Sequence, residues 1–177
     1  MRCPLYLLAV SLGVQAATLE RLSLDDMTAR STAIVRARAI SSSVSYIGST
    51  IYTRTRFQVL ESWKGQEKAE VEVFQPGGTV GQTTQHYAGT PRFTPGQEAV
   101  LFLWSGPSGR AQLIGLSQGL FEVERNAAGE IEVRRRPSGE VLLAPGTGQP
   151  AAEEVLVMPL RSLATRVRDT LERERRR

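Results

Sequence analysis

The strongest pattern in the first half of the chain is an alternation of apolar and charged residues. Small or apolar side chains occupy every second position of three segments, 33–44, 50–62 and 69–75, with polar side chains between them. A period of two is typical of half-buried β-strands rather than helices. Gly48 and Gly65 lie between the segments, where the chain must turn. The pattern therefore predicts three consecutive strands of a small β-barrel or β-sandwich.

Ile34 falls on a face that is expected to point outward. Most charged residues of these strands also fall on such faces. They are Arg36, Arg38, Arg54 and Arg56 in the first two strands and Glu70 and Glu72 in the third. Opposite charges on neighbouring strands favour cross-strand pairs on a solvated surface. A polar recognition surface is the alternative interpretation of the same pattern.

Further strands are predicted in the second half of the chain. The run AVLFLW, residues 99–104, is apolar on both faces, as in a central strand. Short strands are expected over 111–116 and 119–124, followed by a hairpin of 130–135 and 140–143 that turns at Pro137-Ser138-Gly139.

Two helices are predicted, one near each end of the chain. Residues 22–30 have Ser23 and Asp26 in the spacing of a capping box. From Leu160 onward the apolar positions recur at helical spacing, and they are Leu160, Leu163, Ala164, Val167 and Leu171. The arginine-rich residues after Leu171 offer no apolar contacts, so we expect that end to fray.

Residues 1–16 have the pattern of a secretory signal peptide. Arg2 precedes an apolar run over 5–14, and small residues flank a cleavage position before Ala17. An uncleaved membrane anchor is the alternative, although the run is shorter than the roughly 20 residues that a membrane-spanning helix needs. The pattern predicts export, with a secreted or periplasmic destination.

The chain has few groups for catalysis or metal binding. Cys3 is its one cysteine and lies in the predicted signal, so disulfides, a thiolate nucleophile and cysteine ligands are excluded after cleavage. His86 is the single histidine; no G-x-S-x-G elbow surrounds a serine, and no acid is near His86 in sequence. The glycine-rich residues 76–81 lack the Lys-Ser/Thr ending of a phosphate loop. We therefore predict no enzymatic activity, no cofactor and no metal.

Residues 75–96 break the alternation and form the most chemically varied part of the chain. Their many glycines and prolines predict a long ordered loop, and such loops are often functional. The candidate binding residues are His86, Tyr87, Arg92 and Phe93. The alternative is a connector over one end of the barrel, with Tyr87 and Phe93 plugging the core.

The positive charge of the chain is concentrated at its C-terminus. Residues 161–177 hold seven arginines against three acidic residues, and the rest of the chain after the signal is nearly neutral. This distribution predicts no specific nucleic-acid partner. The arginine cluster is a candidate contact for a polyanion or a membrane surface, and a solvated helix end is the alternative.

Residues 33–124 resemble the N-terminal part of netrin-type modules and of tissue inhibitors of metalloproteinases. The matching segments are STAIVRARAISSSV, IYTRTRFQVLESWKG, VEVF and AVLFLW. The resemblance implies a small OB-like β-barrel closed by helices. The chain is also similar to uncharacterised exported bacterial proteins with a P-G-G loop, a G-x-P-x-F-x-x-G segment and a Gly-x-Phe strand, here residues 76–78, 89–96 and 119–121.

The resemblance to the inhibitors does not extend to their mechanism. Those proteins bind the protease zinc through a cysteine at the mature N-terminus, whereas here the predicted cleavage exposes Ala17-Thr18-Leu19. Without that cysteine the zinc-binding step has no counterpart in this chain.

Together these observations predict a mainly β protein, an OB-like antiparallel barrel with a short N-terminal helix and a C-terminal amphipathic helix. The expected parts are the signal 1–16, the barrel domain 17–143, a linker 144–158 and the helix with its arginine-rich end 159–177. The predicted function is non-enzymatic binding of another exported or envelope protein, with a protease among the possible partners. Protease inhibition, and polyanion or membrane-surface contact through the C-terminus, are the alternatives.

Overall fold

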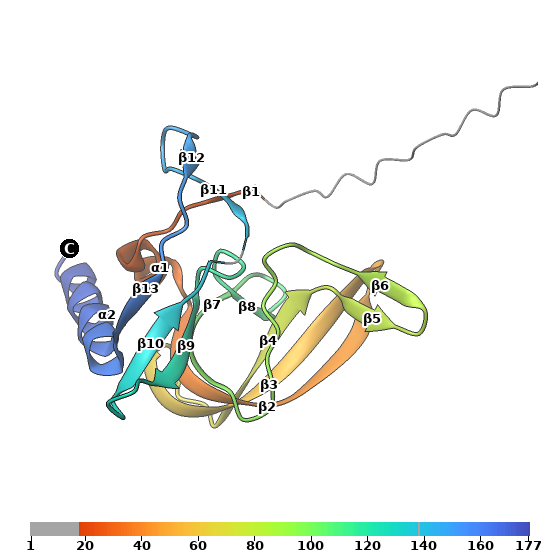
Figure 1. Cartoon of the computed structure of the whole chain (residues 1–177), viewed down its shortest axis with the longest axis horizontal. Coiled ribbons are helices and arrows are strands. Elements are labelled where there is room, and N and C mark those ends of the chain that lie inside the picture. Colours follow the sequence, from red (N-terminus) through yellow and green to blue (C-terminus); the bar gives the residue numbers. More distant parts are fainter. Residues whose placement is uncertain (1–17, 138) are drawn as a thin grey trace, which may run out of the picture.

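The computed structural model describes residues 18–137 and 139–177, so the predicted signal peptide lies outside the described residues (Figure 1). The elements follow the order β1 (Thr18–Glu20), α1 (Leu24–Arg30), β2 (Ala33–Ile47), β3 (Thr50–Lys64), β4 (Glu70–Pro76), β5 (Gly78–Val80), β6 (Thr83–Gln85), β7 (Glu98–Ser105), β8 (Ala111–Leu113), β9 (Leu120–Arg125), β10 (Ile131–Arg135), β11 (Val141–Leu143), β12 (Pro150–Ala151), β13 (Leu156–Pro159) and α2 (Leu160–Arg175).

Five strands of the main sheet form a barrel-like ring. The sheet has the order β13-β10-β9-β7-β2-β3-β4-β8, and β8 also pairs with β7, so the sheet returns on itself. The closing contact between β4 and β8 is parallel and consists of one residue pair, Val73 with Ala111. This partial ring, with a short helix before it and a helix at the C-terminus, confirms the predicted fold class.

The two faces of the ring bury two separate hydrophobic clusters. The cluster within the ring contains Val35, Ala37, Ala39, Phe57, Val73, Ala99, Leu101, Leu103 and Leu113. The cluster beneath the helices contains Leu22, Met27, Ile34, Val100, Phe102, Ile114, Phe121, Val133, Leu163 and Val167. β7 contributes residues to both clusters, and this is why its sequence is apolar on both faces. Ile34 was expected to point outward, but it is fully buried because α1 and α2 cover that face.

The predicted charge pairs occur on the outer faces of β2, β3 and β4. Arg54 lies 3.6 Å from Glu72, and Arg56 lies 3.6 Å from Glu70. All four side chains are about half exposed, so each pair contributes at most about 1 kcal/mol. Their geometry supports the interpretation as a solvated, paired surface.

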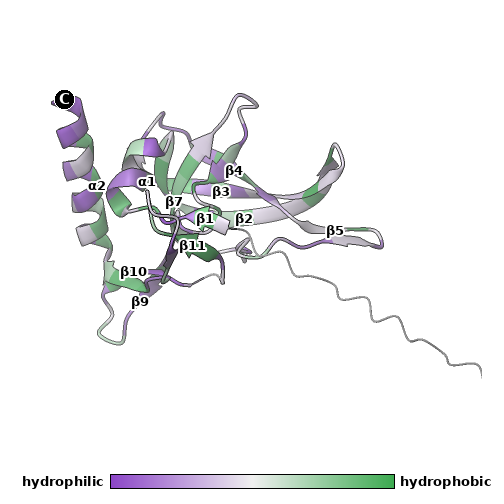
Figure 2. Cartoon of the chain, turned by 90° about the horizontal axis from the view of Figure 1, so that it is seen from above, coloured by the Kyte–Doolittle hydropathy of each residue, from purple (hydrophilic) through white to green (hydrophobic). Residues whose placement is uncertain are grey.

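The helices pack against each other as well as against the sheet. The capping box of α1 is present, with Asp26 N–H donating to Ser23 Oγ at 3.1 Å and Ser23 N–H donating to Asp26 Oδ2 at 3.2 Å. On α2, Thr170 Oγ1 donates to Asp25 Oδ1 at 2.7 Å. Hydrophilic and hydrophobic residues alternate along α2 (Figure 2). The helix extends past Leu171 to Arg175, and Arg173 also reaches Asp25, at 3.0 Å.

The hairpin predicted over 130–143 is wrong. β10 pairs with β9 and β13, whereas β11 pairs with β1 and β12. The range 144–158, predicted as a linker, contains β12 and most of β13. Leu156 and Met158 of β13 pack on the hydrophobic cluster beneath the helices, which explains why this short segment extends the sheet. No helix in 18–137 or 139–177 has the length and apolar character needed to cross a membrane.

Candidate binding site

The segment 75–96 contains a short hairpin as well as loops. β5 and β6 pair with each other in antiparallel fashion, with Gly78 opposite Gln85 and Val80 opposite Thr83. The hairpin lies beside the far ends of β2 and β3, beyond the ring (Figure 1). The expectation of a single long loop missed this hairpin, because three-residue strands leave too short a pattern to detect.

Gly78 allows the hairpin to approach β2 and β3 closely. Its φ is +138°, and a Cβ at this position would lie 2.5 Å from Val44 Cγ1 and 3.0 Å from Thr53 Oγ1. No larger residue fits without displacing these neighbours. Gly81, at the tip of the same hairpin, has no atom within 4 Å of its would-be Cβ.

Hydrogen bonds tie the rest of the segment to the barrel. Gln85 Oε1 accepts from Ile51 N–H at 2.7 Å, and Gln85 Nε2 donates to Ser49 O at 3.1 Å. Gln75, which is 2% exposed, donates through Nε2 to Pro91 O at 2.9 Å. The segment is therefore anchored at both its hairpin and its returning loop.

All four predicted binding residues line one hollow of about 320 Å³ between this segment and the inner face of β2 and β3. The lining consists of Ser42, Val44, Thr53, Pro76, Gly77, Gly78, Thr79, Gln85, His86, Tyr87, Thr90, Pro91, Arg92 and Phe93. None of these residues is acidic. The structure thus brings together residues that the sequence grouped by composition alone.

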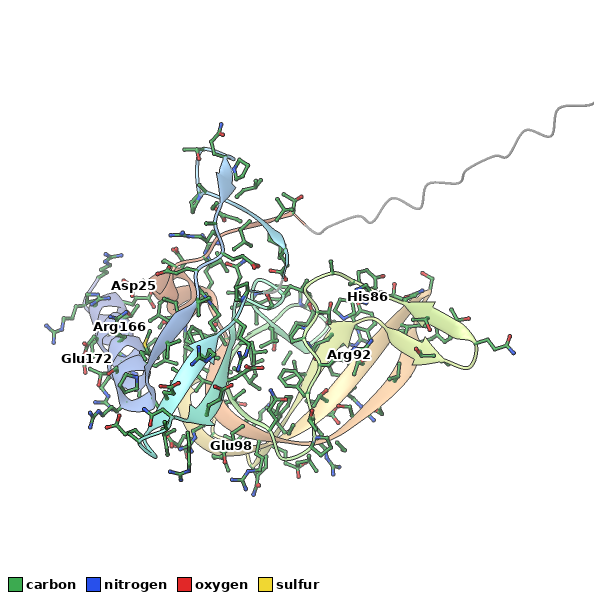
Figure 3. The ribbon with its side chains drawn as sticks, in the orientation of Figure 1. Asp25, His86, Arg92, Glu98, Arg166 and Glu172 are labelled. Carbon is green, nitrogen blue, oxygen red and sulfur yellow. The ribbon has the colours of Figure 1, made fainter. Side chains whose placement is uncertain are left out.

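The four residues differ in their surroundings. Phe93 packs edge-on against the buried Phe57, with ring centroids 4.8 Å apart, so it is part of the wall and of the barrel core. Tyr87 is 40% exposed. His86 and Arg92 are exposed and make no ion pair among the described residues. Figure 3 shows both in the region around β6 and the following loop, far from Asp25 and Arg166 at the helices.

A second hollow of about 470 Å³ adjoins the first. The two share His86, Thr90, Pro91 and Arg92. The second also contains Glu122 of β9, Arg134 of β10 and Arg136, which follows β10. Arg136 is bound to Glu122 at 2.5 Å and also to Glu124. Because these charges neutralise one another, Arg92 is the cation available to a ligand at the junction.

Some wall residues were missed by sequence reasoning. Ser42, Val44 and Thr53 belong to strands that were assigned to the barrel alone. Ser42 and Val44 had one signal, the absence of charged residues from positions 41–47, whereas Thr53 lies beside Arg54 and had none. Thr90 Oγ1 is a further group of interest, since it is buried between the two hollows without a hydrogen-bond partner in the described part of the chain.

His86 makes no hydrogen bond to a serine or carboxylate within the described residues. No group of three or more histidine, cysteine or acidic residues in that part of the chain is placed to hold a metal ion. At the C-terminus, Arg173 and Arg176 are engaged with Asp25 and Glu172.

Comparison with known proteins gives no match: no family model, no curated protein and no solved structure is similar to this chain.

Proposed function

We propose that the chain is an exported, non-enzymatic module that binds another protein through the hollow between 75–96 and the inner face of β2 and β3. The observation that carries this proposal is the convergence of His86, Tyr87, Arg92 and Phe93 on one hollow without an acidic residue. Exposed tyrosine and arginine on a fixed scaffold are the residue types that most often anchor protein interfaces.

The anchoring of the segment supports recognition rather than mere connection. Ordering a flexible surface on binding reduces the affinity, and a surface that is already ordered avoids this loss. Gly78, Gln85 and Gln75 all hold the segment in place without using His86, Tyr87 or Arg92. These three side chains therefore remain available to a partner.

Affinity capture tests the proposal. The chain from Ala17 is incubated with secreted and envelope fractions of the source organism, and bound proteins are identified by mass spectrometry. The test variant combines Tyr87→Ala and Arg92→Ala. Arg166→Ala is the matched control, because Arg166 is exposed and lies on α2, far from the hollow (Figure 3).

We expect a stoichiometric partner that the control retains and the double variant loses. A partner retained equally by both variants contradicts the proposed surface. If the partner is a protease and the chain inhibits it, the narrower inhibitor function is supported.

A further inference from the structure

The far half of β2 has an unpaired edge next to the hollow. β7 pairs with β2 from Ala33 to Arg38, and Ala39 makes the last backbone hydrogen bonds on that side, with Gln97 O and Gly96 N–H. From Ser41 to Ile47, β3 is the one partner strand of β2 in the described chain. In Figure 1 this half of β2 lies along the outer margin of the molecule.

This edge lacks the features that usually protect sheet edges. The segment Ser41–Ile47 reads SSSVSYI and has no proline, lysine or other charged residue. All but the last of its residues are exposed, including Val44 at 38% and Tyr46 at 48%. A long, uncharged edge of this kind is a template for pairing with another strand.

The hydrogen bonds of Ile51 show which groups of β2 face this edge. Ile51 O accepts from Gly77 N–H at 2.8 Å, and Ile51 N–H donates to Gln85 Oε1 at 2.7 Å. Both groups thus point away from β2. Tyr46, which lies opposite Ile51, therefore belongs to a non-hydrogen-bonded pair and directs its own N–H and C=O to the free edge.

The same alternation applies to Val44 and Ser42, which lie opposite Thr53 and Thr55. Their backbone groups face the free edge, and both residues line the hollow. Residues of an added strand that lie directly opposite them project from the same face of the sheet. Side chains at every second position of the added strand would therefore face the hollow that contains Arg92 and His86.

We propose that the Ser41–Ile47 edge binds an extended acidic segment of the partner protein as an additional strand, with alternate side chains entering the hollow. This inference rests on the proposed function and specifies its partner. An acidic side chain fits because Arg92 makes no ion pair among the described residues and the hollow has no carboxylate among its lining residues. A second copy of the same edge fits less well, since Ser41–Ile47 itself has no acidic residue.

A yeast-displayed library of random nine-residue peptides provides the probe. After selection against the chain, we expect enrichment of Asp or Glu at positions two residues apart. In amide exchange measured by NMR, the N–H groups of Ser42, Val44 and Tyr46 should exchange rapidly in the free protein and become protected by the selected peptide. Those of Ser43 and Ser45, which face β3, should be protected in both states.

Val44→Pro removes one N–H from the free edge and leaves the pairing with β3 intact, whereas Val44→Thr keeps that N–H. We expect the proline variant to bind the peptide about tenfold more weakly and the threonine variant to bind nearly as well as the original. If Val44→Pro fails to fold, the exchange measurement on the unaltered chain decides.

Three outcomes overturn the inference: selected peptides without acidic enrichment, unchanged exchange at Ser42, Val44 and Tyr46, or protection of these amides by self-association without peptide. The inference and the proposed function can fail separately. If the double variant at Tyr87 and Arg92 loses the captured partner while these amides stay unprotected in the complex, the hollow binds the partner and the edge is not involved. If the double variant retains the partner, the proposed function fails.

Discussion

Phe93 and Tyr87 have similar side chains but different roles at the residue scale. We expect Phe93→Ala to lower the free energy of unfolding by roughly 2–3 kcal/mol, because it leaves a gap against Phe57 in a half-buried site. Tyr87→Ala should change it by less than about 0.5 kcal/mol. Urea denaturation of both variants measures these values, and equal losses would contradict the assignment of Phe93 to the core.

The capping box of α1 predicts a dependence of stability on pH. The hydroxyl of Ser23 donates to Asp26 and holds the pKa of that carboxyl below its ordinary value, with a smaller contribution from the Ser23 backbone. Because the folded-state pKa is the lower one, this stabilisation is present above the unfolded-state pKa and is lost as the pH falls below about 4.

Ser23→Ala should therefore lower the free energy of unfolding by about 1 kcal/mol at neutral pH. Part of this difference should disappear in acid, because Asp26 is then protonated and the original protein also lacks the bond from Ser23 to the carboxylate. Unfolding followed by circular dichroism at pH 7 and at pH 3 compares the two proteins. A difference that is the same at both pH values would show that Asp26 does not contribute as described.

At the element scale, the hairpin of β5 and β6 depends on Gly78. Gly78→Ala should push the hairpin from β2 and weaken partner binding, because its Cβ meets Val44 Cγ1 at 2.5 Å. Gly81→Ala is the matched control in the same hairpin: its positive φ costs about 1–2 kcal/mol, but no neighbour is displaced. Affinity for the captured partner checks this, and equal binding by the two variants would argue against the close approach of Gly78.

The elements that could be predicted from the sequence are those with a local signal. Alternation predicted β2, β3 and β4, and a capping box predicted α1. The hairpin of β5 and β6 and the strands β12 and β13 are too short for a detectable period, and contacts far away in sequence define them. The contact of Arg173 in α2 with Asp25 in α1 likewise joins residues far apart in sequence.

For the whole molecule, the composition of residues 75–96 predicted that a candidate site lies there, but not its second wall. That wall comes from β2 and β3, and their approach to the segment depends on tertiary packing around Gly78. The sequence also did not predict that β10 and β11 belong to different sheets, because the alternation of a strand says which residues are buried and not which strand is its neighbour.

Recognition through the hollow and the free edge can be tested by amide exchange across the whole chain, with and without the captured partner. We expect new protection to be confined to Ser42, Val44 and Tyr46 at the free edge of β2 and to residues 86–92 beside it. Protection centred instead on α2 or on the outer faces of β3 and β4 would contradict the claim that this chain recognises its partner through the hollow.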